Sequence, residues 1–283
     1  MFSNTAYKIF HQKNIHYIKI DGDHEDVTPL IFLHGMFGGL SNFDRLLDLL
    51  GGKRNIIVPE MPLYDNRNKA LSVQNLSEWV REHVIHNFGL DKVILLGNSL
   101  GGHIALDYAL KDPQKVAGLV LTGSSGLFEH GFGCSRPRRY DRNYIRERTS
   151  MTFYDLKVDE AIIDEIQQIL KSRRKLTKLL KIARSAHDYN MESLLDKIYQ
   201  PCLLVWGRND VITPPNVAQN FMQILPNARL AWIDKCGHAP MMEQPEQFAK
   251  ILNNYLDIIE STDSENESLT TNQTNYEREK SYL

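Results

Sequence analysis

A serine stands at the centre of a short glycine-rich turn near the middle of the chain. Gly97, Ser99 and Gly101 form the pattern Gly-x-Ser-x-Gly, after the predicted strand 92–96 and before the helical pattern 103–110. Such a strand, turn and helix are typical of a nucleophile elbow, which exposes the serine hydroxyl above the edge of a sheet. The helix start also directs backbone N–H groups towards negative charge that develops beside the serine. Ser99 is therefore the candidate nucleophile.

An acid and a histidine follow later in the chain, each after an apolar run that predicts a strand. Asp210 follows the run 202–206, and His238 follows the run 230–233. A serine hydroxyl is a weak nucleophile, so a histidine must accept its proton while a carboxylate fixes the imidazole tautomer. The order serine, acid, histidine is that of α/β-hydrolases. We therefore predict Ser99, Asp210 and His238 as a catalytic triad.

A second glycine-rich segment, residues 34–39, follows the apolar run 30–33. The oxyanion of a tetrahedral intermediate is held by two backbone N–H groups, one from the residue after the nucleophile and one from such an early loop. The first donor would be Leu100. For the second, Met36 is the expected residue and Phe37 the alternative. Each donor contributes on the order of 3 kcal/mol to stabilising the transition state.

Strands and helices alternate around these residues over most of the chain. Two alternating runs, 7–10 and 15–20, predict an antiparallel pair of strands at one edge of a sheet. The run 30–33 is continuously apolar, which is typical of a parallel strand buried on both faces, and the segments 55–59, 92–96, 116–122, 202–206 and 230–233 are also predicted strands. The predicted fold is therefore α/β, with a mostly parallel twisted sheet and helices on both faces.

The alternation is interrupted between residues 127 and 199, where charged helical patterns replace strands. We interpret residues 127–199 as a helical cap over the carboxyl ends of the strands, where open α/β sheets bind ligands. Residues 1–126 and 200–260 would then form the α/β-hydrolase core. The segment 261–283 has hardly an apolar residue and is expected to be a disordered polar tail.

Composition restricts the possible partners. The formal net charge of -2 argues against a nucleic-acid-binding protein, and no apolar run is long enough to predict a membrane span. The first residues lack the apolar stretch of a signal peptide, and the cysteines, Cys134, Cys202 and Cys236, are odd in number and scattered. These features favour the cytoplasm and a small-molecule substrate. None of them bears on the oligomeric state.

We expect neither a cofactor nor a metal. His83 and His86 lie one turn apart on a predicted helix, but no cysteine or carboxylate cluster accompanies them. A solvated helix face explains this pair better than metal ligation does.

The motifs resemble those of a known superfamily. Over residues 7–259 the chain is similar to the α/β-hydrolase fold superfamily, and several segments resemble the capped hydrolases that cleave carbon–carbon bonds in meta-ring-cleavage products. These segments are Gly97-Asn98-Ser99-Leu100-Gly101-Gly102, Val205-Trp206-Gly207-Arg208-Asn209-Asp210, Cys236-Gly237-His238 and Ser41-Asn42-Phe43. The chain departs from those hydrolases at its shorter oxyanion loop and at Ala239, where they carry a tryptophan.

The resemblance also implies residues that contact the substrate. Asn98 and Asn42 would face it, and a cap arginine, Arg173 or Arg174, would hold a substrate carboxylate. Phe37, in the predicted oxyanion loop, completes the expected set of substrate-binding residues.

Two classes of function compete. The first is a serine hydrolase of a small carboxylic ester or related acyl compound, with hydrolysis of carbon–carbon bonds in vinylogous 1,5-diketo acids as its nearest variant. The second is a ligand-binding, receptor-like protein that keeps the fold with little turnover. The complete set of serine, acid and histidine favours the enzyme.

Overall fold

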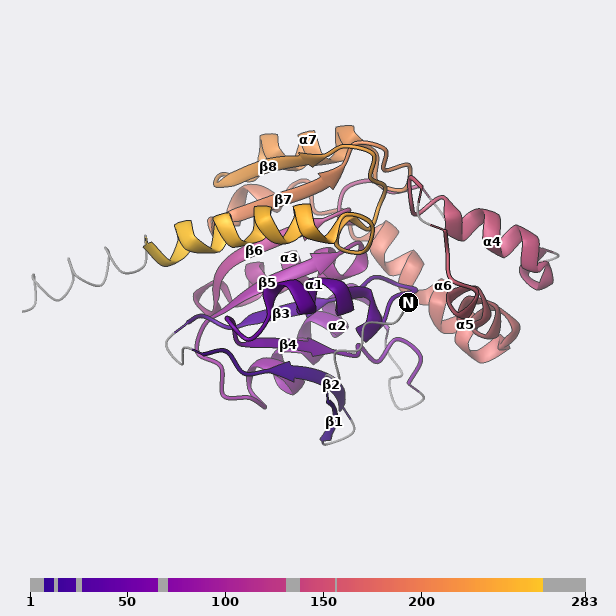
Figure 1. Ribbon diagram of the computed structural model, residues 1–283, viewed down its shortest axis with the longest axis horizontal. Helices are drawn as coiled ribbons and strands as arrows, with labels where there is room; N and C mark the ends of the chain where they lie inside the picture. The colour runs from indigo at the N-terminus through magenta and orange to yellow at the C-terminus, as the bar shows by residue number, and fades with distance from the viewer. Residues whose placement is uncertain are drawn as a thin grey trace, which may run out of the picture.

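The computed structural model describes residues 8–12, 15–23, 27–65, 71–130, 138–155 and 157–261. Within these residues the chain forms an eight-stranded sheet in the order β1-β2-β4-β3-β5-β6-β7-β8 (Figure 1). The strands are β1 Ile9–Gln12, β2 Ile15–Ile20, β3 Leu30–Leu33, β4 Ile56–Pro59, β5 Val93–Asn98, β6 Val116–Thr122, β7 Cys202–Gly207 and β8 Ala228–Ile233. The predicted α/β fold is confirmed.

The direction of the strands determines where a ligand can bind. β2 is antiparallel to both β1 and β4, whereas all pairs from β4 to β8 are parallel. The strand order reverses at β3, which lies between β4 and β5. Ligands bind to open sheets of this kind in the crevice at the carboxyl ends of the strands beside such a reversal. The loops that follow β3 and β5 meet at this crevice.

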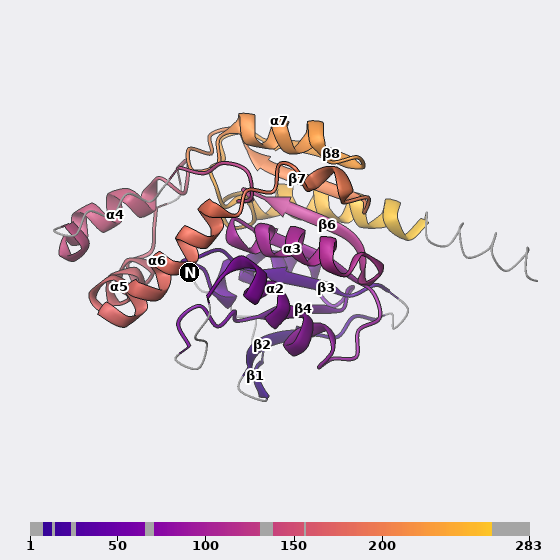
Figure 2. The same ribbon diagram turned by 180° about the vertical axis from the view of Figure 1, so that it is seen from behind.

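Two apolar cores lie on opposite faces of the sheet. Side chains alternate along each strand, so Ile31 and Leu33 point into one core and Leu30 and Phe32 into the other. This double burial explains why the parallel strands are continuous apolar runs. The first core is covered by α2 Val73–Val80, α3 Leu100–Lys111 and α7 Pro215–Ile224, seen from their own side in Figure 2. The second is covered by α1 Asp44–Leu50 and the last helix, residues 245–261.

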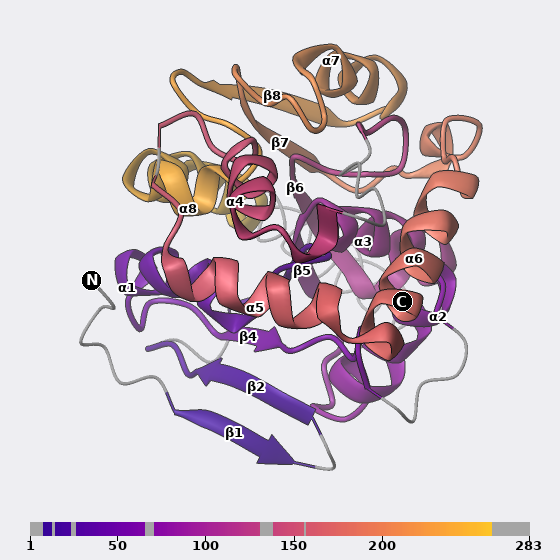
Figure 3. The same cartoon turned by 90° about the vertical axis from the view of Figure 1, so that its right-hand side faces the viewer.

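Between β6 and β7 the described residues form helices and no strand, and we call these helices the helical insert. Its helices are α4 Arg142–Ser150, α5 Glu160–Lys171 and α6 Arg173–Asp188. Figure 3 shows them in front of the sheet, over the end at which the parallel strands finish. The insert has its own apolar cluster, whose members include Ile145, Ile163 and Leu179. The loop after β3 packs against this cluster through Met36 and Phe37.

Two features named in the sequence analysis, the polar tail and Cys134, lie wholly or mostly outside the described residues. The proposed polar tail lies outside the described residues except for Ser261, which ends the last helix. Cys134 also lies outside them.

Among the described helices, every one is too short or too polar to cross a bilayer.

Candidate active site

Ser99 occupies a sharp turn between β5 and α3. Its backbone is in the left-handed region, with φ 52° and ψ -117°, which a non-glycine residue adopts only under strain of order 1–3 kcal/mol. The two glycines of the motif allow this close packing. A Cβ on Gly97 would lie 2.4 Å from the carbonyl carbon of Gly101, and one on Gly101 would lie 2.0 Å from the carbonyl oxygen of Leu33. The turn therefore has the geometry of a nucleophile elbow.

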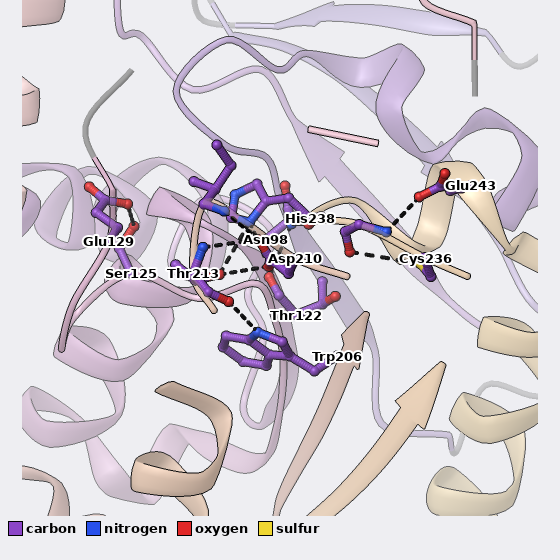
Figure 4. A network of polar contacts seen from close by, with 12 residues as sticks. Asn98, Thr122, Ser125, Glu129, Trp206, Asp210, Thr213, Cys236, His238 and Glu243 are labelled. Atoms are coloured by element: carbon purple, nitrogen blue, oxygen red, sulfur yellow. Dashed lines mark hydrogen bonds and ion pairs between the residues drawn. The ribbon is translucent and has the colours of Figure 1, made fainter. Parts of the chain in front are cut away.

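The side chains of His238 and Asp210 form a buried pair. His238 Nδ1 lies 2.9 Å from Asp210 Oδ2, and the two residues are only 6% and 2% exposed (Figure 4). Asp210 Oδ1 accepts the backbone N–H groups of Ile212 and Thr213 at 2.8 and 2.9 Å. The carboxylate is thereby fixed and able to accept a proton-bearing Nδ1. This leaves the other ring nitrogen, Nε2, as the one that would accept a proton.

Thr213 contacts both members of this pair, a role that we did not predict from the sequence. Its hydroxyl donates to Asp210 Oδ2 at 2.8 Å and lies 3.2 Å from His238 Nδ1. The indole N–H of Trp206 donates to the Thr213 carbonyl at 2.8 Å, which holds the loop against the end of β7. A threonine three residues after the acid was the available signal, because an aspartate often accepts bonds from the second and third residues that follow it.

The environment of His238 raises the pKa of its imidazole above the ordinary value. Burial alone lowers the pKa by disfavouring the charged ring, but the charge and hydrogen bond of Asp210 and the charge of Glu129 outweigh it. The same interactions would stabilise the imidazolium that forms when His238 accepts a proton during catalysis.

Asn98 fixes the backbone of the histidine loop. Its side-chain amide donates to the carbonyls of Thr122 and His238, each at 3.0 Å. The backbone N–H of His238 donates to the Thr152 carbonyl at 2.7 Å, so the insert also holds this loop. Asn98 borders the cavity, as expected, but both of its N–H groups bond to main chain. Its contribution is therefore chiefly to position His238.

The candidate oxyanion donors are not used in the hydrogen bonds of the fold. The backbone N–H groups of Met36 and Leu100 donate to no acceptor within the described part of the chain. Leu100 is the first residue of α3, so it has no partner one turn earlier in the helix. Asn42 holds the glycine-rich loop by accepting the N–H of Gly39 at 3.1 Å. Two unoccupied donors beside Ser99 are what an oxyanion hole requires.

A cavity of about 460 Å³ lies between the sheet and the helical insert. This volume fits a small ligand. The cavity joins the candidate nucleophile and base to both glycine-rich segments and to all three helices of the insert or their flanking residues. Its lining residues include Met36, Phe37, Asn42, Asn98, Ser99, Thr149, Ile162, Ile166, Ala183 and His238.

The charge of the cavity differs from the expectation. Glu129 and Glu165 line it, and no lysine or arginine belongs to its lining within the described residues. Ser125 Oγ donates to Glu129 at 2.7 Å. Arg173 and Arg174 are exposed in the first turn of α6. The part of α6 that reaches the cavity begins at Ala183, about 15 Å further along the helix axis. The structure therefore brings neither arginine to the triad.

Among the described residues, neither the cysteine thiols nor a metal site adds a further reactive group. Burial raises the pKa of both the Cys202 and the Cys236 thiol, so neither supplies a thiolate near neutral pH. No group of three or more His, Cys, Asp or Glu side chains with a geometry for metal binding occurs in the regions that the structure describes.

Comparison with known proteins identifies the family to which this chain belongs. Residues 30–251 match the alpha/beta hydrolase family. The chain is therefore a member of the alpha/beta hydrolase family, and it is a hydrolase.

Individual relatives carry related names. The solved structure of MGS-MChE2, an alpha/beta hydrolase enzyme from a sediment metagenome of the Mar Chica lagoon, is 37% identical with a TM-score of 0.72 over 88% of this chain and 98% of that one. A pimeloyl-[acyl-carrier protein] methyl ester esterase of Nitrosomonas europaea is 29% identical over 77% of this chain and 92% of the relative. A 2-hydroxy-6-oxononadienedioate/2-hydroxy-6-oxononatrienedioate hydrolase of Pseudomonas putida is 26% identical over 82% and 88%.

Proposed function

We propose that this protein is a serine esterase that hydrolyses small carboxylic esters through an acyl-enzyme on Ser99. The observation that carries the proposal is the shared cavity of Ser99, in its left-handed turn, and His238, whose ring is held by Asp210. The methyl ester esterase among the relatives supports the same substrate class.

The reaction follows from the placement of these groups. Ser99 Oγ attacks the acyl carbon while its proton passes to His238 Nε2, and the carbonyl oxygen becomes an oxyanion. The N–H groups of Met36 and Leu100 stabilise that charge. When the carbon–oxygen bond breaks, His238 returns the proton to the leaving alcohol. Water then attacks the acyl-enzyme with the same proton transfers, which releases the acid and restores Ser99.

Hydrolysis of carbon–carbon bonds is the second candidate, because one relative is named for the hydrolysis of a ring-cleavage product. Such substrates carry carboxylates. The described lining of the cavity carries two carboxylates of its own and no lysine or arginine. Like charges in a partly desolvated cavity repel, so the arrangement favours neutral esters over anionic diketo acids.

We further propose that residues 127–199 act as a cap domain and that the protein resides in the cytoplasm. The described helices of this segment lie over the carboxyl ends of the parallel strands (Figure 3), and residues of α4, α5 and α6 line the cavity. The buried, unpaired thiols of Cys202 and Cys236 support a reducing compartment.

The test is turnover of p-nitrophenyl acetate and butyrate by the wild-type protein and by Ser99→Ala. We expect steady turnover by the wild type and a loss of at least a hundredfold in the variant, because the nucleophile is absent. Ser77→Ala is the matched control, since Ser77 is buried in the core and its hydroxyl has no partner among the described residues. A burst without turnover would instead indicate a receptor-like protein.

A further inference from the structure

The loop that carries the second expected oxyanion donor, Met36 or its alternative Phe37, is held from one side at Gly35. The Gly35 carbonyl lies 2.8 Å from His34 Nδ1 and accepts the N–H of Gly38 at 3.1 Å. The N–H of Met61 donates to His34 Nε2 at 3.0 Å, so Nδ1 is the nitrogen that bears the proton. Because a trans peptide is planar, fixing the Gly35 carbonyl directs the N–H of Met36 the opposite way.

A second contact holds the next peptide of this loop. The hydroxyl of Tyr64 donates to the Met36 carbonyl at 2.9 Å. Tyr64 and Met61 both belong to the segment that follows β4. Met36 is therefore fixed on both sides, through His34 before it and through Tyr64 after it. A rotation of either peptide would redirect the N–H of Met36 or that of Phe37, the two candidate donors.

The ring of Tyr64 lies between the first sheet core and the helical insert and packs against both. It packs, with Met36 and Phe37, against the apolar cluster that α4, α5 and α6 form. Lys175 Nζ, from α6, lies 5.8 Å from the centre of the ring. Tyr64 thus joins the oxyanion loop to the insert through one rigid side chain.

We propose that Tyr64 is a positioning residue that holds the oxyanion loop in place through the Met36 carbonyl. This inference rests on the esterase function proposed above. The hydroxyl touches a backbone carbonyl rather than the substrate, so its loss should weaken stabilisation of the transition state while substrate binding is retained.

The test is Tyr64→Phe, which keeps the ring and removes only the hydroxyl. We expect kcat for p-nitrophenyl butyrate to fall about tenfold with KM within twofold. Tyr255→Phe is the matched control, because the Tyr255 hydroxyl also donates to a backbone carbonyl, that of Leu119 at 3.1 Å, but lies in the core behind the sheet. Its kcat should stay within twofold of the wild-type value.

A tetrahedral inhibitor separates positioning from general stability. A trifluoromethyl ketone forms an oxyanion on Ser99, so its inhibition constant should rise in Tyr64→Phe by the same factor by which kcat falls. Thermal midpoints of all variants show that they are folded at the assay temperature, and Tyr64→Met repeats the test with different packing.

The inference is overturned if Tyr64→Phe keeps kcat within twofold, if KM alone rises, or if Tyr255→Phe loses as much activity. Failure of the esterase function would be recognised separately, as turnover in the wild type that does not depend on Ser99.

Discussion

Thr213 and His238 share one oxygen of Asp210, at 2.8 and 2.9 Å from Asp210 Oδ2. The acid of the candidate triad therefore has a third partner beyond the imidazole and the backbone. A hydroxyl that donates to a carboxylate takes up part of its negative charge and limits its rotation.

Replacing Thr213 by valine, which has a similar shape, should lower kcat about fivefold to tenfold. Without the hydroxyl, Asp210 stabilises the imidazolium more strongly, so the midpoint of the pH–rate profile should move to higher pH. Thr213→Ser restores the hydroxyl and should recover both values. A profile unchanged in Thr213→Val would assign this hydroxyl to loop packing alone.

Asp210→Asn should reduce kcat by about ten-thousandfold, because an amide stabilises the wrong imidazole tautomer. Asp234 is the matched control. It is the nearest acid to the histidine in sequence, yet it is exposed and pairs with Arg208 at 2.7 Å. Kinetics with p-nitrophenyl butyrate should show Asp234→Asn at the wild-type rate; a loss below tenfold in Asp210→Asn would identify another acid.

The pH dependence should follow the imidazole of His238. The base must be neutral to accept a proton, so kcat/KM should rise with pH through one ionisation and then remain level. Because the surroundings raise the pKa of His238, the midpoint should lie above the ordinary value of about 6.5.

Glu129→Gln removes one of the charges that raise the His238 pKa, and its midpoint should therefore lie at lower pH than that of the wild type. Activity that fell as pH rose across this interval would exclude His238 as the base.

The charge of the substrate should affect kcat/KM through the carboxylates of the cavity and not through the arginines at the start of α6. We expect mono-p-nitrophenyl glutarate, an anionic ester, to react at least tenfold more slowly in kcat/KM than p-nitrophenyl butyrate. Glu129→Gln should reduce the difference in kcat/KM between the anionic and the neutral ester. Arg173→Ala and Arg174→Ala should leave both substrates unchanged. A selective loss for the anionic ester in either arginine variant would restore the carboxylate clamp that the resemblance implied.

Much of the fold could be predicted because strands buried on both faces leave little choice of residue. The runs 30–33 and 116–122 were predicted with the bounds that β3 and β6 have, and the elbow motif located Ser99 between β5 and α3. At these positions the local sequence pattern and the packing requirements of the fold favour the same structure, so the structure can be predicted.

The partners of the site residues were harder to predict. Thr213 and Tyr64 act through contacts between loops, whose geometry depends on how separate elements pack rather than on local pattern. The arginines at the start of α6 illustrate the same difficulty: a helix was predictable from its periodicity, but not which end of it reaches the cavity. The direction of a helix in the insert, and how far it reaches towards the cavity, depend on tertiary contacts.

The bond from Asn98 to the His238 carbonyl joins residues 140 positions apart. The serine turn lies before the insert, whereas the acid and the base come after it, so the candidate machinery is divided between two distant stretches of chain. During synthesis the first stretch leaves the ribosome well before the second, and Ser99 has no base to activate it until β7 and β8 join the sheet. Under the proposed mechanism, hydrolysis would therefore begin only after β7 and β8 have paired with the earlier strands.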